Sequence, residues 1–297
     1  MNDGSRGVAR LGRSVLLLVG FFVVVAVLWE GFKWLFGDPW RIDDMLGTGV
    51  SYFHQPPWRL LQATDLQLPH VWQIFGALAE PVQRNQDQTL FQYLVGAAAY
   101  TWVEAFIGFS LGAIIGVTLS AIFVHSMLAE RASMPFVITS QTIPIVALAP
   151  LIVVSFGRGM TSVVIIATYL TFFPVTISQL RGLRSPDLRA MELMRSYAAS
   201  NWAIFWKVRM PASMPYLFTA LKVAAAASIV GAIIGEGPGG VKEGLGRAIV
   251  NFNHQYITGP EKLWATILIA SLTGICFYIL VRIAEIISLR HRRPVQL

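Results

Sequence analysis

The chain has 297 residues, of which 55% are hydrophobic and only 13% are charged. Soluble domains carry about 25% charged residues, so the composition argues against a soluble globular protein. The net charge of +7 is carried by loops and tails that long apolar runs separate, which argues against nucleic acid as a partner.

The amino-terminal region pairs a polar, arginine-containing tail, 1–14, with a long apolar run, 15–36. A signal peptide is the alternative interpretation. The run is long, however, and no small-residue cleavage site follows Trp29, so the pattern predicts a retained first membrane span. Trp34 and Trp40 continue an aromatic belt at its outer end.

A polar excursion follows over residues 37–93. Three arginines against six acidic residues between 37 and 90 give a balance of −3, which suits the extracytoplasmic side. The stretch 68–78 predicts a short interfacial helix. We assign no chemistry to this excursion.

The second span is predicted at 94–124. Glycines punctuate it at Gly96, Gly108, Gly112 and Gly116, and small residues let helices approach closely in lipid.

Glu104 is an ionisable group inside the second span. An intramembrane charge is a functional candidate by default. The alternative, which we favour from the sequence, is an interfacial glutamate paired with a basic residue.

The third and fourth spans are predicted at 135–156 and 160–180. Pro144 and Pro150 lie in the third and Pro174 in the fourth. Prolines kink spans because they break the helical hydrogen-bond ladder. Pro144 and Pro150 are therefore candidates for a transport pathway, with plain packing as the alternative.

A basic, polar segment, 181–213, interrupts the apolar chain. Six basic residues against two acidic ones between 181 and 215 give +4, which places the segment in the cytoplasm. Its apolar residues recur every three or four positions, which indicates helix. We expect two short helices, the second capped by Ser200 and ended by Pro211 and Pro215. A helix that merely rests on lipid headgroups is the alternative.

The fifth span is predicted at 214–235. Its small residues make it a candidate pore-lining helix, with Lys222, Ser228 and Gly231 as low-ranking pathway candidates. Lys222 is expected to snorkel or to pair with a carboxylate such as Glu192 or Glu104.

The remainder contains a glycine-rich stretch, 235–246, a polar stretch, 251–257, and a sixth span, 262–282. The glycine-rich stretch matches a dinucleotide-binding spacing, but it follows a membrane span rather than a strand. We interpret it as an outer loop that begins with a helix C-cap. Residues 251–257 are a candidate patch for a docking protein, and the basic tail 286–297 is expected inside.

The segment 181–213 resembles the coupling loop of permease subunits of binding-protein-dependent ATP-binding cassette (ABC) importers. The family pattern is Glu-Ala-Ala, three residues, Gly, nine residues, then Ile-x-Leu-Pro. Glu192 and Pro211 match it literally, whereas Ala198 replaces the glycine. Residues 90–286 resemble the nitrate, sulfonate and taurine branch, which includes pyrimidine-precursor and riboflavin permeases. Glu104 departs from the arginine that the family often carries at its position.

The resemblance implies an all-α integral membrane protein of about six transmembrane helices, with the type-1 ABC importer fold over 94–285. It implies no cofactor or metal, and no enzymatic activity in this chain. The implied partners are two ATPase subunits, a second permease copy or homologue, a substrate-binding protein and the lipid bilayer. It places the chain in a prokaryotic plasma membrane with both termini cytoplasmic. The residues that it assigns to ATPase coupling are Glu192, Arg195, Ala198, Ala199, Ser200, Trp202 and Pro211.

The sequence contains no Walker A motif and no HExxH or CxxC motif, and Cys276 is its only cysteine. Energy must therefore come from another polypeptide or from an ion gradient. A gradient-driven secondary transporter remains the alternative function, and a membrane-bound enzyme lacks any catalytic constellation. Sulfonate- or nitrate-type anions and pyrimidine- or riboflavin-type vitamin precursors all remain open as substrates.

Overall fold

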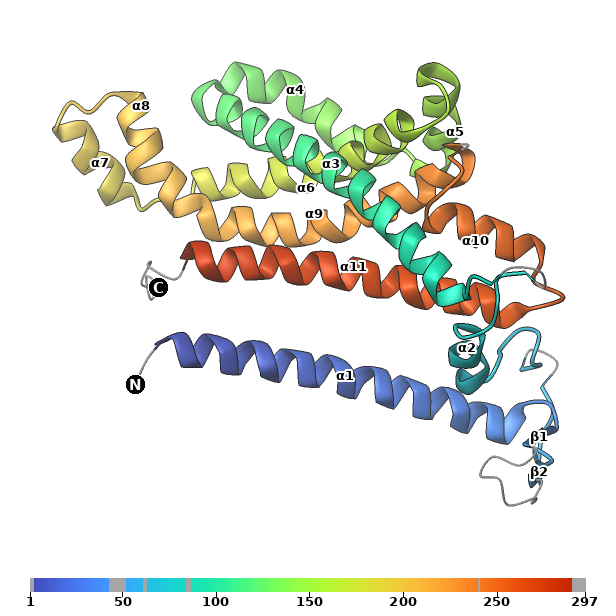
Figure 1. Ribbon diagram of the computed structural model, residues 1–297. Coiled ribbons are helices and arrows are strands. Elements are labelled where there is room, and N and C mark those ends of the chain that lie inside the picture. The colour runs from blue at the N-terminus through green and yellow to red at the C-terminus, as the bar shows by residue number, and fades with distance from the viewer. Residues whose placement is uncertain (1–2, 43–51, 61–62, 84–86, 240, 290–297) are drawn as a thin grey trace. The chain divides into compact units, whose positions relative to one another are not determined.

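The computed structural model describes residues 3–42, 52–60, 63–83, 87–239 and 241–289 (Figure 1). The described chain is almost entirely helical, which confirms the predicted all-α class. It forms two compact units, one of residues 1–93 and 251–267, the other of residues 94–250 and 268–297.

The first four elements are α1 (Asp3–Phe36), β1 (Trp40–Ile42), β2 (Tyr52–His54) and α2 (Val71–Ala77). Then come α3 (Leu90–His125), α4 (Met127–Ser140), α5 (Ile145–Phe156), α6 (Met160–Leu183), α7 (Leu188–Ser196), α8 (Asn201–Ile204), η1 (Phe205–Arg209), α9 (Met210–Gly239), α10 (Leu245–His254) and α11 (Pro260–Leu289).

Four of the described helices are long and apolar enough to cross a membrane: α3, α6, the helix Asn201–Pro238, and α11. Counting the bent pair α4 and α5 as one span raises the number to five. The predicted first span, 15–36, lies within α1.

The predicted third span, 135–156, is not one kinked helix. The chain is helical from Met127 to Ser140, breaks, and resumes at Ile145 after a bend of 102°. Pro144 is the N-cap of α5, and proline disfavours helical backbone in the residue before it. The hydroxyl of Tyr169 on α6 donates a hydrogen bond to the carbonyl of Ser140, which fixes the end of α4.

In the first unit, the carboxy-terminal part of α1 is tied to residues of the segment 37–93 by polar contacts. Lys33 is fully buried and forms an ion pair with Asp65. Trp29 donates to the carbonyl of Pro69 at 3.0 Å. The predicted helix in 68–78 is α2, and β1 pairs antiparallel with β2, a hairpin that the sequence did not indicate.

In the second unit, α3, α6 and α9 pack against one another, and α6 with α9 forms its most extensive helix pair (Figure 1). The glycines of α3 make the approach possible. A Cβ at Gly108, Gly112 or Gly116 would lie within 2.8 Å of an α6 atom. The prediction that these glycines allow close packing is confirmed, whereas Gly96 faces open space.

Pro211 and Pro215 do not end the second short helix, contrary to prediction. From Asn201 the chain is helical without interruption to Pro238, with both prolines inside it. Just before Pro211 the helix widens into the π-helical turn η1, and the N–H of Met210 bonds to the carbonyl of Phe205. A π turn changes the local pattern of backbone hydrogen bonds, which a proline in a regular helix would otherwise interrupt.

The glycine-rich stretch is only partly a loop. α9 continues through Gly239, and α10 begins at Leu245. Gly244, with φ of +113°, makes the turn between them in a conformation that side chains rarely adopt.

Candidate functional site

The segment 181–213 contains a helix, a tight turn and a second helix. Asp187 caps the start of α7 by accepting the N–H of Arg189 at 3.2 Å. At the other end of α7, the N–H of Ala198 bonds to Arg195 and that of Ala199 to Met194, at 2.9 and 3.0 Å. This pair of bonds is the Schellman ending of a helix.

Ala198 occupies the left-handed position of this ending, with φ of +50°. It is the only non-glycine residue in the described chain with positive φ. The resemblance places a glycine here, and the structure explains why, because a side chain at this backbone conformation costs about 1 kcal/mol.

We predict that Ala198→Gly stabilises the turn by about 1 kcal/mol, a factor of about five in its opening equilibrium. Hydrogen–deuterium exchange of the amides of Ala198 and Ala199 should slow accordingly. Ala203→Gly is the matched control, since Ala203 lies inside α8 and glycine there should speed local exchange. Equal effects of the two changes would contradict the left-handed assignment.

Ser200 caps α8, as predicted, by accepting the N–H of Ala203 at 3.2 Å. Three aromatic residues, Trp202, Phe205 and Trp206, follow within the next two turns and pack against one another. Phe205 is buried, with its ring 5.0 Å from that of His125 on α3, whereas Trp202 and Trp206 are 65% and 51% exposed. These rings and the end of α3 together line an open hollow of about 530 Å³.

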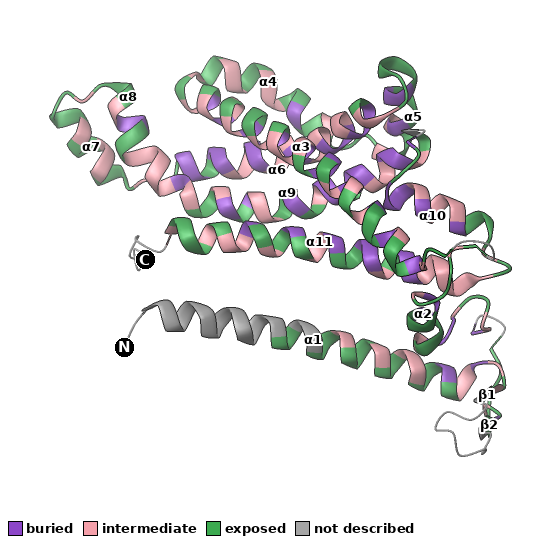
Figure 2. Ribbon diagram, viewed as in Figure 1, coloured by how far each residue is buried: buried purple, intermediate pink, exposed green. Residues whose placement is uncertain are grey.

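Most of α7 and α8 lies on the surface (Figure 2). Glu192, Arg195 and Ser200 are exposed, and Ala199 is half-buried. Large apolar side chains are also exposed at Leu188, Leu193 and Tyr197. Apolar surface gathered on a polar, basic segment indicates an interaction site.

The pathway candidates lie in different environments. Pro144 and Pro150 are exposed at the N-cap and within α5. Ser228 is buried and bonds to the carbonyl of Ala225 on its own helix, and Gly231 packs against Ala167 of α6. A pathway between two copies would be lined by residues exposed on one copy, so this placement favours packing for Ser228 and Gly231.

Lys222 pairs with a carboxylate, as one of the two expectations had it, but the partner is neither Glu192 nor Glu104. Its ammonium lies 2.8 Å from a carboxylate oxygen of Glu285 on α11, and both side chains are 20% exposed. The partner lies 63 residues away in the sequence, beyond the reach of any local pattern.

Glu104 is not an interfacial residue paired with a base, so the favoured interpretation of it was wrong. It is fully buried, and neither carboxyl oxygen has a hydrogen-bond partner among the described residues. The charged group that acts on it is another buried carboxyl, Glu236 near the end of α9. Sequence reasoning missed Glu236; the available signal was a carboxylate at the point where a membrane span runs into a glycine-rich stretch.

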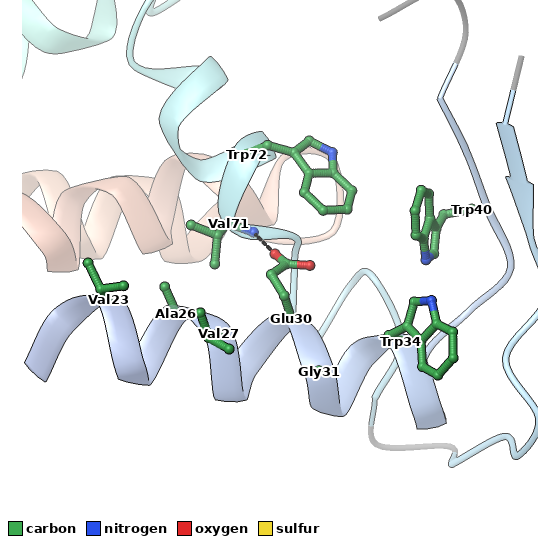
Figure 3. Close-up of a pocket in the computed structure, with 9 residues that line it drawn as sticks. All are labelled: Val23, Ala26, Val27, Glu30, Gly31, Trp34, Trp40, Val71 and Trp72. Carbon is green, nitrogen blue, oxygen red and sulfur yellow. Dashed lines mark hydrogen bonds between the residues drawn. The ribbon is translucent and has the colours of Figure 1, made fainter. Parts of the chain in front are cut away.

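The first unit holds a tryptophan-lined hollow of about 560 Å³ beside Glu30 of α1 (Figure 3). Trp34, Trp40 and Trp72 line one side of it. Glu30 accepts the N–H of Val71 at 2.5 Å and its other oxygen lies 2.9 Å from Nδ1 of His70. These contacts hold the start of α2 against α1.

His70 is a buried histidine whose ring stacks on Trp72 at 3.9 Å. Burial lowers its pKa below the ordinary 6.5, and Lys33 acts in the same direction, while the hydrogen bond to Glu30 and the charge of Asp65 oppose them. The folded protein therefore binds fewer protons at this site than the unfolded chain, and acid destabilises it.

We predict that the stability due to neutral His70 is fully present above pH 6.5 and is lost as the pH falls through the lower folded-state pKa. The melting temperature should drop between about pH 7.5 and about pH 5.5, and His70→Gln should reduce that drop. His254→Gln, at an exposed histidine, is the control and should leave the drop unchanged. An equal drop in wild type and His70→Gln would assign the acid sensitivity elsewhere.

Comparison with known proteins adds to this geometry. The sequence pattern of the family described as "Binding-protein-dependent transport system inner membrane component" matches residues 108–285. The chain is 35% identical over 190 residues to the formylaminopyrimidine transport permease ThiX of Halalkalibacterium halodurans, covering 63% of this chain and 74% of that protein. It is 33% identical to the riboflavin transport permease RibX of Chloroflexus aurantiacus, covering 56% of this chain and 61% of RibX.

A solved amino acid ABC transporter has a similar fold, with a TM-score of 0.54 at 16% identity, covering 66% of this chain and 94% of that one. The family match spans more than half of the chain and includes α6, the segment 181–213, all of α9 and most of α11. The chain belongs to the family of binding-protein-dependent transport system inner membrane components, the permease subunits of ABC importers.

Proposed function

We propose that this permease works as a pair, either two copies or one copy with a homologue, and that each copy docks one ATPase subunit. The docking surface would be α7, the turn at Ala198, and α8. The observation that carries the proposal is the exposure of Trp202 and Trp206 beside a basic surface, because exposed tryptophans at a concentrated site favour a protein partner. Binding of ATP would draw the two docking surfaces together and switch the spans.

The proposed arrangement has six spans: α1, α3, the α4–α5 pair, α6, the α8–α9 helix, and α11. It places the termini and the segment 181–213 in the cytoplasm of a prokaryotic cell, and residues 37–93 and 251–257 outside. Basic residues near the inner ends support this orientation. A substrate-binding protein would dock on the outer loops.

For the substrate we favour a nitrogen heterocycle of the pyrimidine-precursor or riboflavin type. ThiX and RibX match at 35% and 33% identity, whereas the taurine permease TauC of Escherichia coli matches at 24%. ATP hydrolysis by the assembled transporter should rise with a binding protein loaded with a pyrimidine precursor or riboflavin. A rise with taurine or nitrate instead would overturn this choice.

The docking surface is tested with Ala198→Asp. Aspartate tolerates the left-handed conformation, so the change adds a charge with little backbone strain. We expect loss of co-purification with the ATPase and of uptake, with membrane insertion intact. Ala198→Gly is the matched control and should keep both. Normal uptake by Ala198→Asp would exclude this contact, and transport by the chain alone without ATP would favour the gradient-driven alternative.

A further inference from the structure

Glu104 presents a carboxyl group in a setting where a bare charge is costly. On α3 it directly precedes Ala105, a member of the buried apolar cluster that also contains Val163 and Phe277. It is fully buried, and its oxygens accept no hydrogen bond from any described residue. Burying an ionised carboxylate without a partner costs several kcal/mol, so the group must be neutralised.

The neighbouring carboxyl, Glu236, is also fully buried, but its oxygens accept several hydrogen bonds. One of its oxygens accepts the hydroxyl of Thr101 at 2.5 Å, and the other accepts the N–H of Gly246. The backbone N–H of Arg247 adds a further bond. The hydroxyl oxygen of Thr101 in turn accepts the N–H of Leu245 at 2.9 Å. Several donors aimed at one carboxyl stabilise its ionised form.

We propose that Glu104 and Glu236 form a proton-binding site, with one proton carried by Glu104 and shared with the Glu236 carboxylate. The two carboxyls are neighbours, because Thr101, which donates to Glu236 at 2.5 Å, lies one helical turn before Glu104 on α3, and Glu236 is the charged group that acts on Glu104. Two carboxyl groups can form a hydrogen bond with each other only when one of them carries a proton. A protonated Glu104 would donate that proton to Glu236, so Glu104 needs no donor of its own. Paired carboxyls that share a proton are the general solution for two acids held in contact.

A metal or hydrated cation fits this site less well than a proton. The described residues contain no group of three or more carboxylate, histidine or cysteine side chains that would hold a metal ion. The packing is tight, since a Cβ on Gly244 would lie 2.4 Å from the carboxyl carbon of Glu236. Tyr100 on α3 interacts electrostatically with both glutamates and with Glu243 in the turn, and none of these groups supplies a positive charge. The nearby basic residues Lys242 and Arg247 are not among the charges that act on either carboxyl.

The proton would hold the turn 241–246 in place. Leu245 and Gly246, the first residues of α10, donate their backbone N–H groups to Thr101 and Glu236, respectively. The site therefore joins α3, the end of α9 and the start of α10. Loss of the proton would place two negative charges in contact and push the two glutamates apart.

The direct test is infrared spectroscopy of the purified chain at neutral pH, comparing wild type with three variants. We expect a protonated-carboxyl band in wild type that is lost in Glu104→Gln. In Glu236→Gln the band should persist at a shifted frequency, and in Glu243→Gln, at an exposed residue of the same turn, it should be unchanged. Absence of the band in wild type, or its survival in Glu104→Gln, would overturn the proposal.

A second measurement, independent of the infrared band, is the pH dependence of stability. An ordinary glutamate is ionised above about pH 5, so the folded protein would bind one more proton than the unfolded chain. The unfolding equilibrium constant of wild type, divided by that of Glu104→Gln, should therefore rise about tenfold per pH unit. A ratio that is independent of pH but falls with added sodium would show that a cation, not a proton, fills the site.

Discussion

Replacing Gly112 with alanine is expected to lower the free energy of unfolding by about 2 kcal/mol. The added Cβ would lie 2.5 Å from the Cβ of Thr171 and 2.8 Å from the carbonyl oxygen of Thr168. Contacts this short force α3 away from α6, and part of that contact is with the backbone, which cannot rotate aside. The loss should exceed the helix-propensity gain of about 1 kcal/mol that alanine brings.

Gly96→Ala is the matched control, because Gly96 lies on the same helix and a Cβ there would meet no atom within 4 Å. That change should leave stability unchanged or raise it by up to about 1 kcal/mol. Thermal unfolding of the purified permease measures both. Similar melting temperatures for the two variants would show that α3 and α6 do not pack through Gly112.

Replacing Lys222 with methionine is expected to cost about 3 kcal/mol. The change leaves the carboxylate of Glu285, only 20% exposed, without the ammonium 2.8 Å away. A mostly buried charge that loses its partner is more damaging than the loss of both members of the pair. The double variant Lys222→Met with Glu285→Leu should therefore recover most of the lost stability.

Arg59→Met supplies the comparison, because Arg59 is 72% exposed and pairs with Asp38 at 3.3 Å. Its loss should cost well under 1 kcal/mol, as exposed ion pairs contribute little. A double-mutant cycle at 222 and 285 measures the coupling directly. Additive effects of the two single changes would contradict a direct ion pair.

Features set by nearby residues were predictable from the sequence. The cap at Ser200 and the glycine-mediated packing of α3 both follow from residue type and spacing, and the structure has both. The significance of position 198 was also visible, since alanine stood where a glycine was expected. Only the structure gives the physical reason, which is that this residue, at the end of α7, has left-handed backbone dihedral angles.

Features set by distant residues were not predictable. Lys222 pairs with Glu285, which is 63 positions away in the sequence. Glu104 lies beside Glu236, which is 132 positions away. The behaviour of the prolines depends on context in a similar way. Pro144 coincides with a sharp break between α4 and α5, whereas Pro211 follows a π turn and the helix continues. Residue type alone does not distinguish these two outcomes.

The unbroken helix from Asn201 to Pro238 has a mechanical consequence. At 1.5 Å per residue, the 30 residues of α9 span about 45 Å, so α9 alone is longer than the hydrocarbon layer is thick. The helix bends where α8 meets α9, near the π turn η1 and Pro211 (Figure 1). A helix can flex at such a bend, so a sideways displacement of Trp202 would reach Glu236 only as far as the π turn resists bending. The stiffness of this one turn would therefore set how strongly the two ends of the helix report on each other.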